Sequence, residues 1–290
     1  MKIFALPGNT LLARNITRHL GAELGAFTVR HFPDGESYVR LLCDVEGQQA
    51  VVVCTLFQPD DKILPLYYLS RLLKDSGAQS VTLVAPYLAY MRQDKVFNPG
   101  EAVTSEYFAA LLSSAVDRLI TIDPHLHRHV SMSEIYTIPC KAIHAAQLVS
   151  DWIRQNVVNP VLIGPDSESE QWVSEVAAKA GAPFLILEKV RHGDHDVDVS
   201  KPVVEPYSNH TPVLVDDIIS TAHTMIETVG HLRVAGMAVP VCIGVHPVFS
   251  GNAYDDLVGA GAAEVVSCNT IQHSSNRIDV SELLATAISE

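Results

Sequence analysis

A polar loop in the last third of the chain carries side chains that could bind a phosphate group. The run Val213–Val215 predicts a buried strand, and residues 216–224 lead from it into a helix that we expect to begin near Met225. Three hydroxyl side chains lie in this loop: Ser220, Thr221 and Thr224. Together with the unpaired N–H groups of a helix amino terminus, they suit a phosphate dianion. A strand, a polar turn and a Ser/Thr helix cap without any ligand would explain the same residues, and both interpretations stay open.

Charged side chains of both signs accompany this loop. Asp216 and Asp217 would repel a phosphate placed beside them, so we expect them to face sugar hydroxyls or a metal-bound water. Lys189 and Arg191 alternate along an extended segment, which puts both side chains on one side if that segment is a strand, as a phosphate clamp requires. The polar residues up to Ser200 are typical of a mobile active-site lid, although a plain surface hairpin fits them equally well.

A group of histidines follows the predicted strand of residues 119–122. The polar residues there alternate along the chain: Asp123, His125, His127 and His129. Such a cluster could bind zinc, but its spacing lacks the i, i+4 pair of a His-Glu-x-x-His helix. A histidine at a strand end more often makes a local hydrogen bond.

These chemical groups follow strand-length apolar runs, which alternate with helix-length amphipathic segments. The runs are residues 2–5, 50–55, 81–85, 119–122, 161–163, 184–187, 213–215 and 239–245. Alternation of this kind predicts βαβ units around mainly parallel sheets, whose ligands bind at the carboxyl ends of the strands. The predicted fold class is therefore α/β, with its chemistry in the loops that follow strands.

The two halves of the sequence resemble each other. Val29-Arg-His31 recurs as Val190-Arg-His192, and Val51-Val-Val-Cys54 parallels Val213-Leu-Val-Asp216, at an offset of roughly 160 residues. The matches keep their order along the chain. We therefore predict two similar α/β domains, residues 1–146 and 147–290, each a mainly parallel sheet flanked by helices.

The composition argues against a nucleic-acid-binding protein and against a membrane protein. The 290 residues are 48% hydrophobic, which allows one or two ordinary cores, and their formal net charge of −13 would repel nucleic acid. The five cysteines are scattered without metal spacing, which favours a reduced cytoplasmic compartment. No apolar run approaches the roughly 18 residues of a membrane span. We expect a soluble cytoplasmic protein that binds neither nucleic acid nor membrane.

The pattern Asp-Asp-x-x-Ser-Thr-x-x-Thr of residues 216–224 resembles the phosphoribosyl-binding loop of ribose-phosphate diphosphokinases and phosphoribosyltransferases. Five further segments resemble, in the correct order, motifs of the diphosphokinase (phosphoribosyl pyrophosphate synthetase) family: Phe32-Pro-Asp-Gly-Glu-Ser-Tyr-Val-Arg40, Tyr90-Met-Arg-Gln-Asp-Lys95, Asp123-Pro-His125, Gly164-Pro-Asp166 and Glu188-Lys-Val-Arg191. The resemblance covers nearly the whole chain. It implies two fused phosphoribosyltransferase-like (type I) domains, with ATP on the N-terminal side and ribose 5-phosphate on the C-terminal side.

The resemblance also implies roles for particular residues. It assigns ATP binding to Phe32, Asp34, Gly35, Glu36, Arg92 and Gln93. It assigns ribose 5-phosphate binding to Arg191, Asp216, Asp217, Ser220, Thr221, Ala222, His223 and Thr224. It makes Lys189 and Arg191 catalytic and has Mg²⁺ held by His125 and Asp166, while His127 and His129 receive no role. The chain has no G-x-x-x-x-G-K-[ST] pattern, so any ATP must be held without a P-loop. On residue type alone, Pro-Asp-Gly is a turn and Arg-Gln-Asp-Lys a solvated loop.

The implied reaction transfers the diphosphoryl group of Mg-ATP to the 1-hydroxyl of ribose 5-phosphate and releases AMP. Family members assemble, so a homo-oligomer is expected. Two alternatives stay open: a phosphoribosyltransferase that uses the same loop, and a non-catalytic regulatory homologue. Ser220 stands where the family frequently has an acid, and His223 stands where it usually has a glycine. These two residues also leave open a variant sugar phosphate such as ribose 1,5-bisphosphate.

Overall fold

The chain forms two compact units in a computed structural model that describes residues 1–126, 129–164, 169–187, 189–192, 196–199 and 205–290. Unit 1 comprises Met1–Ile143 and Val280–Glu290, and unit 2 comprises His144–Asp279. Each unit has its own sheet and its own hydrophobic core.

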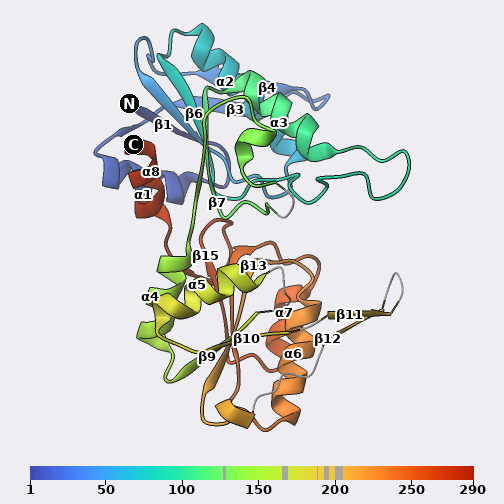
Figure 1. The fold of residues 1–290 in the computed structure, drawn as a ribbon. Coiled ribbons are helices and arrows are strands. Elements are labelled where there is room, and N and C mark those ends of the chain that lie inside the picture. Colours follow the sequence, from blue (N-terminus) through green and yellow to red (C-terminus); the bar gives the residue numbers. More distant parts are fainter. Residues whose placement is uncertain (127–128, 165–168, 188, 193–195, 200–204) are drawn as a thin grey trace. The chain divides into compact units, whose positions relative to one another are not determined.

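Unit 1 is built on a six-stranded parallel sheet with the strand order β2-β1-β5-β6-β7-β8. Its strands are β1 (Lys2–Ala5), β2 (Glu23–Leu24), β5 (Gln49–Val53), β6 (Ser80–Ala85), β7 (Arg118–Ile122) and β8 (Cys140–Ile143). Helices α1 (Thr10–Leu20) and α8 (Ser281–Ser289) cover one face, and α2 (Asp60–Asp75) and α3 (Thr104–Ala115) cover the other (Figure 1). Because both faces are covered, central strands such as β5 are almost wholly apolar.

An antiparallel hairpin and a short 3-10 helix complete unit 1. The hairpin consists of β3 (Phe27–His31) and β4 (Ser37–Leu41), and the 3-10 helix η1 spans Met132–Glu134. The hairpin packs against α2 through β4. It places the loop between its two strands outside the main sheet.

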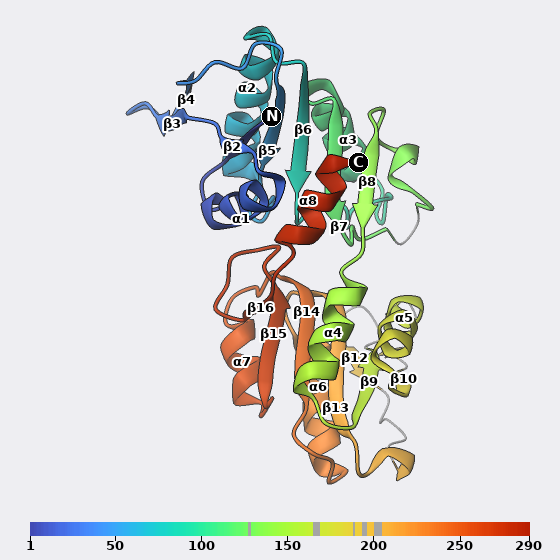
Figure 2. The ribbon, with the colours of Figure 1, turned by 90° about the vertical axis from the view of Figure 1, so that its left-hand side faces the viewer.

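Unit 2 repeats this plan with the strand order β10-β9-β13-β14-β15-β16. Its strands are β9 (Pro160–Gly164), β10 (Phe184–Ile186), β13 (Thr211–Ile219), β14 (Val241–Pro247), β15 (Glu264–Cys268) and β16 (Asn276–Ile278), with an antiparallel pair β11 (Lys189–His192) and β12 (Asp196–Val199). Helices α4 (Ala146–Asn156) and α5 (Glu170–Ala180) lie on one face of the sheet, α6 (His223–Val234) and α7 (Ala253–Gly259) lie on the other (Figure 2), and the 3-10 helix η3 spans Glu205–Tyr207.

The two strand orders are the same once equivalent strands are matched, since β1 corresponds to β9 and β5 to β13. The predicted α/β class with two similar domains, each a parallel sheet flanked by helices, is therefore confirmed. Among the described residues, no helix is both long and apolar enough to cross a membrane.

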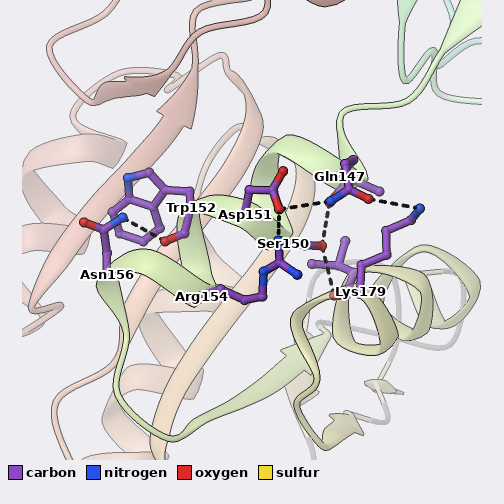
Figure 3. A network of polar contacts seen from close by, with 9 residues as sticks. Gln147, Ser150, Asp151, Trp152, Arg154, Asn156 and Lys179 are labelled. Carbon is purple, nitrogen blue, oxygen red and sulfur yellow. Dashed lines mark hydrogen bonds and ion pairs between the residues drawn. The ribbon is translucent and has the colours of Figure 1, made fainter.

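Helix α4 comes directly after β8 in the chain but belongs to unit 2, where it packs on α5. Figure 3 shows this contact. The buried Ser150 hydroxyl lies 2.6 Å from Ala146 O and 3.0 Å from Val176 O of α5, and Lys179 Nζ donates to Gln147 Oε1 at 3.5 Å. Side-chain and backbone contacts thus fasten the two helices together.

Helix α8 makes the reciprocal exchange, because it follows β16 but packs on α1 of unit 1. Leu284 and Ile288 are buried there, and the Arg118 guanidinium of β7 donates to Ala287 O at 2.9 Å. The sequence pattern placed residues 147–290 in the second domain, whereas Val280–Glu290 cluster with unit 1. An amphipathic pattern shows that a helix has an apolar face, but not which surface covers it.

Candidate functional site

The polar loop of residues 216–224, here named the cradle, begins inside a strand. β13 continues to its end at Ile219, so Asp216 and Asp217 lie within the strand and not in a turn after it. The strand continues because Ile218 and Ile219 are buried and remain paired with β14. Both carboxylates are half-buried.

A left-handed residue turns the chain from β13 into α6. Ala222 has a φ of 59° and caps the helix, and α6 begins at His223, two residues before the expected start. Ala222 O accepts a hydrogen bond from Ile226 N at 2.9 Å, as in the first turn of a helix. The first turn of α6 contains no acidic residue, so no carboxylate of that turn competes with an anion for its N–H groups.

The cradle side chains form one continuous turn from strand to helix. Ser220 and Thr224 are half-buried, and Thr221 and His223 are exposed. Beneath them lies a small pocket, lined by Ile163, Gly164, Leu187, Leu214, Val215, Thr224, Met225 and Thr228. The turn therefore presents hydroxyls and the start of a helix above an apolar floor.

The loop that follows β14 also belongs to this edge of the sheet. Ser250 N donates to Ser220 O at 3.0 Å, and the two hydroxyls lie 3.1 Å apart. Sequence reasoning did not select Ser250. A polar, glycine-containing turn after a strand was nevertheless the signal that selected the other loops.

The end of β9 is closely packed. A Cβ on Gly164 would come within 2.8 Å of both Ile186 Cδ1 and Val173 Cγ2, so a larger residue would have to displace its neighbours. The predicted ligand Asp166 lies outside the described residues. The structure therefore describes the strand that leads to Asp166 but not that side chain.

The predicted catalytic pair lies in β11. Lys189 pairs with Val199 of β12, and Arg191 pairs with Val197, in an antiparallel register. The segment is thus a strand, as the alternation required. The strand is half of a two-stranded hairpin outside the main sheet.

In unit 1, the predicted adenine loop connects the two strands of the β3–β4 hairpin. Phe32 N donates to Glu36 O at 2.8 Å, and Gly35 N donates to Phe32 O at 2.9 Å, with Gly35 at a φ of 92°. Asp34 Oδ1 accepts from Glu36 N at 3.2 Å. The residues therefore do form the turn that their types suggested, and Phe32 within it is 40% exposed.

An arginine stacks on the ring of this loop. The Arg30 guanidinium carbon lies 4.7 Å from the centre of the Phe32 ring and 4.2 Å from that of Tyr38. The two rings meet edge to face at 5.8 Å. Such stacking gives the exposed ring a defined position.

The second predicted ATP loop follows β6 and is anchored on both sides. Thr104 Oγ1 donates to Gln93 Oε1 at 3.0 Å, and Ser105 N donates to Gln93 O at 3.3 Å, whereas Arg92 is exposed. Tyr90, at a φ of 61°, donates its hydroxyl proton to Asp60 of α2, and this hydrogen bond raises the pKa of Tyr90. The loop that carries Arg92 and Gln93 is therefore held to both α2 and α3.

The histidines after β7 do not gather into a described metal site. His125 is half-buried, and His127 lies outside the described residues. His129 Nδ1 lies 2.9 Å from Glu134 Oε2, and this contact lowers the pKa of Glu134. Among the residues the structure describes, no three His, Cys, Asp or Glu side chains are grouped to hold a metal. His129 thus makes the local hydrogen bond that was the alternative to zinc.

Family models match both halves of the chain. The N-terminal domain of ribose phosphate pyrophosphokinase matches residues 1–115, and a phosphoribosyl transferase domain matches residues 131–282. The chain is 32% identical to a ribose-phosphate pyrophosphokinase of Methanosarcina acetivorans over 99% of both chains. It is 33% identical to one of Methanothermobacter thermautotrophicus, over 99% of this chain and 100% of that relative.

A solved structure supports the same comparison. A phosphoribosylpyrophosphate synthetase from Mycobacterium smegmatis superimposes with a TM-score of 0.87 at 26% sequence identity. The match covers 99% of this chain and 97% of the other. The similarity in sequence and in fold therefore extends over both units.

Proposed function

Because the chain belongs to the ribose-phosphate pyrophosphokinase family, we propose that it transfers the diphosphoryl group of Mg-ATP to the 1-hydroxyl of ribose 5-phosphate. The products are phosphoribosyl pyrophosphate and AMP. The observation that carries the proposal is the cradle, a strand-to-helix turn with hydroxyls and an acid-free first helical turn, in a chain whose similarity to these enzymes runs from end to end.

The cradle is the proposed site of ribose 5-phosphate. Ser220, Thr221 and Thr224 would donate their hydroxyl protons to the 5-phosphate, together with the N–H groups at Ala222 and His223. Asp216 and Asp217 would accept hydrogen bonds from the ribose hydroxyls. Their position in the strand, before the turn, supports this division, because it separates the two carboxylates from the amino terminus of α6.

The two anchored loops of unit 1 are the proposed site of ATP. Phe32 would stack on the adenine, the turn of Asp34, Gly35 and Glu36 would accept from its exocyclic amine, and Arg92 and Gln93 would bind phosphate oxygens. The exposed Phe32 ring and the exposed Arg92 support these roles, since neither side chain is buried in the core of unit 1.

Lys189 and Arg191 of the β11 hairpin, together with a divalent cation, would neutralise the negative charge of the reacting phosphates. Attack of O1 of ribose on the β-phosphorus forms one O–P bond and breaks another, so that AMP leaves with the bridging oxygen and the O1 proton is released. Lys189 and Arg191 would stabilise the negative charge that develops on the leaving and equatorial oxygens. Arg191 would also contact the sugar phosphate.

His125 and Asp166 are the proposed protein ligands of Mg²⁺. One imidazole and one carboxylate fit this ion, which usually keeps several waters and accepts few protein ligands. When bound, Mg²⁺ would screen the phosphate charges of ATP. The half-buried position of His125 after β7 supports the assignment.

The remaining partners follow from charge and family. With a net charge of −13, the protein should not bind nucleic acid, and we propose a cytoplasmic homo-oligomer. These statements extend the family membership and do not depend on the geometry of the cradle.

Phosphorus NMR of the purified protein with Mg-ATP and ribose 5-phosphate tests the reaction. We expect AMP and a new sugar-linked diphosphate to appear together in equal amounts. AMP without the sugar diphosphate would contradict the acceptor assignment. Nucleotide binding without either product would favour a regulatory homologue, and a second run with ribose 1,5-bisphosphate would show whether Ser220 and His223 change the acceptor.

A further inference from the structure

The loop after β14 in unit 2, residues 248–252, is joined to the cradle by three hydrogen-bond contacts. Phe249 N donates to Ile219 O at 2.9 Å, and Ser250 N donates to Ser220 O at 3.0 Å. The third contact joins the hydroxyls of Ser220 and Ser250, which lie 3.1 Å apart. This neighbouring loop therefore follows the end of β13 as an added strand would, and it brings a second hydroxyl to the cradle.

The backbone of this neighbouring loop is strained. Phe249 has a φ of 36°, in the left-handed region that a bulky residue rarely adopts. Such residues persist only where their surroundings hold them, and they concentrate at functional sites. The strained conformation of Phe249 therefore suggests that this loop has a functional role.

Aromatic packing holds Phe249 in this conformation. Its ring centre lies 4.6 Å from that of His273 and 5.3 Å from that of Tyr254, and the latter two lie 4.8 Å apart. Burial lowers the pKa of His273, and the charge of Asp255 acts in the opposite direction. These ring contacts hold the loop at Phe249, while Ser250 stays exposed to solvent.

The Ser250 hydroxyl can orient that of Ser220. A serine hydroxyl has one donor and two acceptor positions and rotates about its C–O bond, so a neighbour that donates to its oxygen restricts the directions open to its proton. At 3.1 Å, the Ser250 hydroxyl is placed to donate to Ser220 Oγ, which would restrict the direction of the Ser220 hydroxyl.

We propose that Ser250 is a positioning residue of the sugar-phosphate site, which orients the Ser220 hydroxyl toward the phosphate of bound ribose 5-phosphate. The inference rests on the proposed function and deepens it. It assigns the loop 248–252 to the acceptor site, with Phe249 as the strained residue that brings Ser250 within reach of Ser220.

Steady-state kinetics of Ser250→Ala test this role. We expect the KM for ribose 5-phosphate to rise roughly three- to tenfold, since one hydrogen bond to a charged ligand is weakened. The kcat and the KM for ATP should stay within about twofold. Ser250→Thr keeps the hydroxyl and should restore the wild-type KM. Ser174→Ala removes a half-buried serine hydroxyl of unit 2, which donates to Gln171 O at 2.8 Å, and serves as the matched control.

A double-mutant cycle separates positioning from direct contact. If Ser250 acts through Ser220, Ser250→Ala should have no further effect on the KM for ribose 5-phosphate in a Ser220→Ala background. Full additivity, an unchanged KM in Ser250→Ala, or a failure of Ser250→Thr to rescue would each overturn the proposal. A wild-type protein that makes no phosphoribosyl pyrophosphate would instead refute the proposed function, and the same cycle would then be measured on ribose 5-phosphate affinity by calorimetry.

Discussion

The loop from β5 to α2 in unit 1 and the loop from β13 to α6 in unit 2 occupy the same place in two sheets of the same order, yet their helix amino termini differ in charge. The first turn of α2 contains Asp60 and Asp61, whereas the first turn of α6 contains no acid. Carboxylates at a helix amino terminus interact with the N–H groups that an anion would otherwise use. Unit 1 therefore has two carboxylates at this helix amino terminus, where unit 2 has none.

A lysine of unit 1 also distinguishes the β5–α2 loop from the β13–α6 loop. Lys62 of α2 donates to Thr55 O at 2.9 Å and also to Phe57 O, so the carbonyl groups of the β5–α2 loop are bound by a side chain of the same unit. Burial lowers the pKa of this lysine. Thr55 N in turn donates to Asn9 Oδ1 at 2.8 Å. The duplicated fold thus provides one scaffold twice: side chains of unit 1 bind the carbonyl groups of its loop, whereas we propose that the equivalent loop of unit 2 binds a substrate.

The largest expected effect concerns the β11 hairpin of unit 2, which has the β3–β4 hairpin as its counterpart in unit 1. Lys189→Ala should lower kcat by roughly 100-fold or more, because a charge that stabilises the transition state is lost, with little change in the free energy of unfolding. Thr28, which precedes Val29-Arg-His31 as Lys189 precedes Val190-Arg-His192, provides the control. Thr28→Ala should leave kcat within about twofold, and a comparable loss in both variants would remove the distinction between the hairpins.

The next effect is on stability and concerns the loop that unit 1 closes for itself. Lys62→Met should lower the free energy of unfolding by about 1–3 kcal/mol, because it removes the hydrogen bonds that Lys62 donates to Thr55 O and Phe57 O. Urea denaturation measures the change. Lys74→Met, which breaks an ion pair with Asp117 (2.7 Å) near the surface of the same unit, should cost less than about 1 kcal/mol. Equal losses would show that Lys62 is an ordinary surface lysine.

The smallest expected effect concerns the turn of unit 2. Ala222→Gly should raise the free energy of unfolding by about 0.5–1 kcal/mol, because glycine adopts a φ of 59° without the steric cost that alanine bears. Thermal unfolding with and without ribose 5-phosphate checks both stability and binding. A loss of stability would mean that the turn holds Ala222 in place by contacts of its methyl group.

The sequence allowed the strands and their loops to be predicted, because parallel strands covered on both faces are apolar runs such as Val213–Val215. It did not predict that β13 continues through Asp216 and Asp217, since two adjacent acids usually mark the end of a strand. The exchange of α8 into unit 1 was also missed, because the apolar face of a helix does not specify its partner.

Residues whose roles depend on contacts in the folded protein could not be predicted from the sequence either. Lys62 resembles any exposed lysine of a first helical turn until its distances to the loop carbonyls are known. Ser250 and the strained Phe249 become visible only through backbone geometry and hydrogen bonds to the cradle. The roles of Lys189, Arg191 and Asp166 stay predictions, since their side chains lie outside the part of the protein that the structure describes.

The central claim is that an acid-free helix amino terminus makes the cradle the ribose 5-phosphate site. Isothermal titration of ribose 5-phosphate into His223→Asp tests it directly, because this change gives α6 the carboxylate that α2 has as Asp60. We expect the Kd to rise at least about tenfold through charge repulsion, while the free energy of unfolding is unchanged or slightly higher. In His223→Asn the new side chain has the size of aspartate but no charge, so the Kd for ribose 5-phosphate should stay within about threefold of the wild-type value. If His223→Asp binds ribose 5-phosphate as tightly as His223→Asn does, the phosphate does not lie at the start of α6.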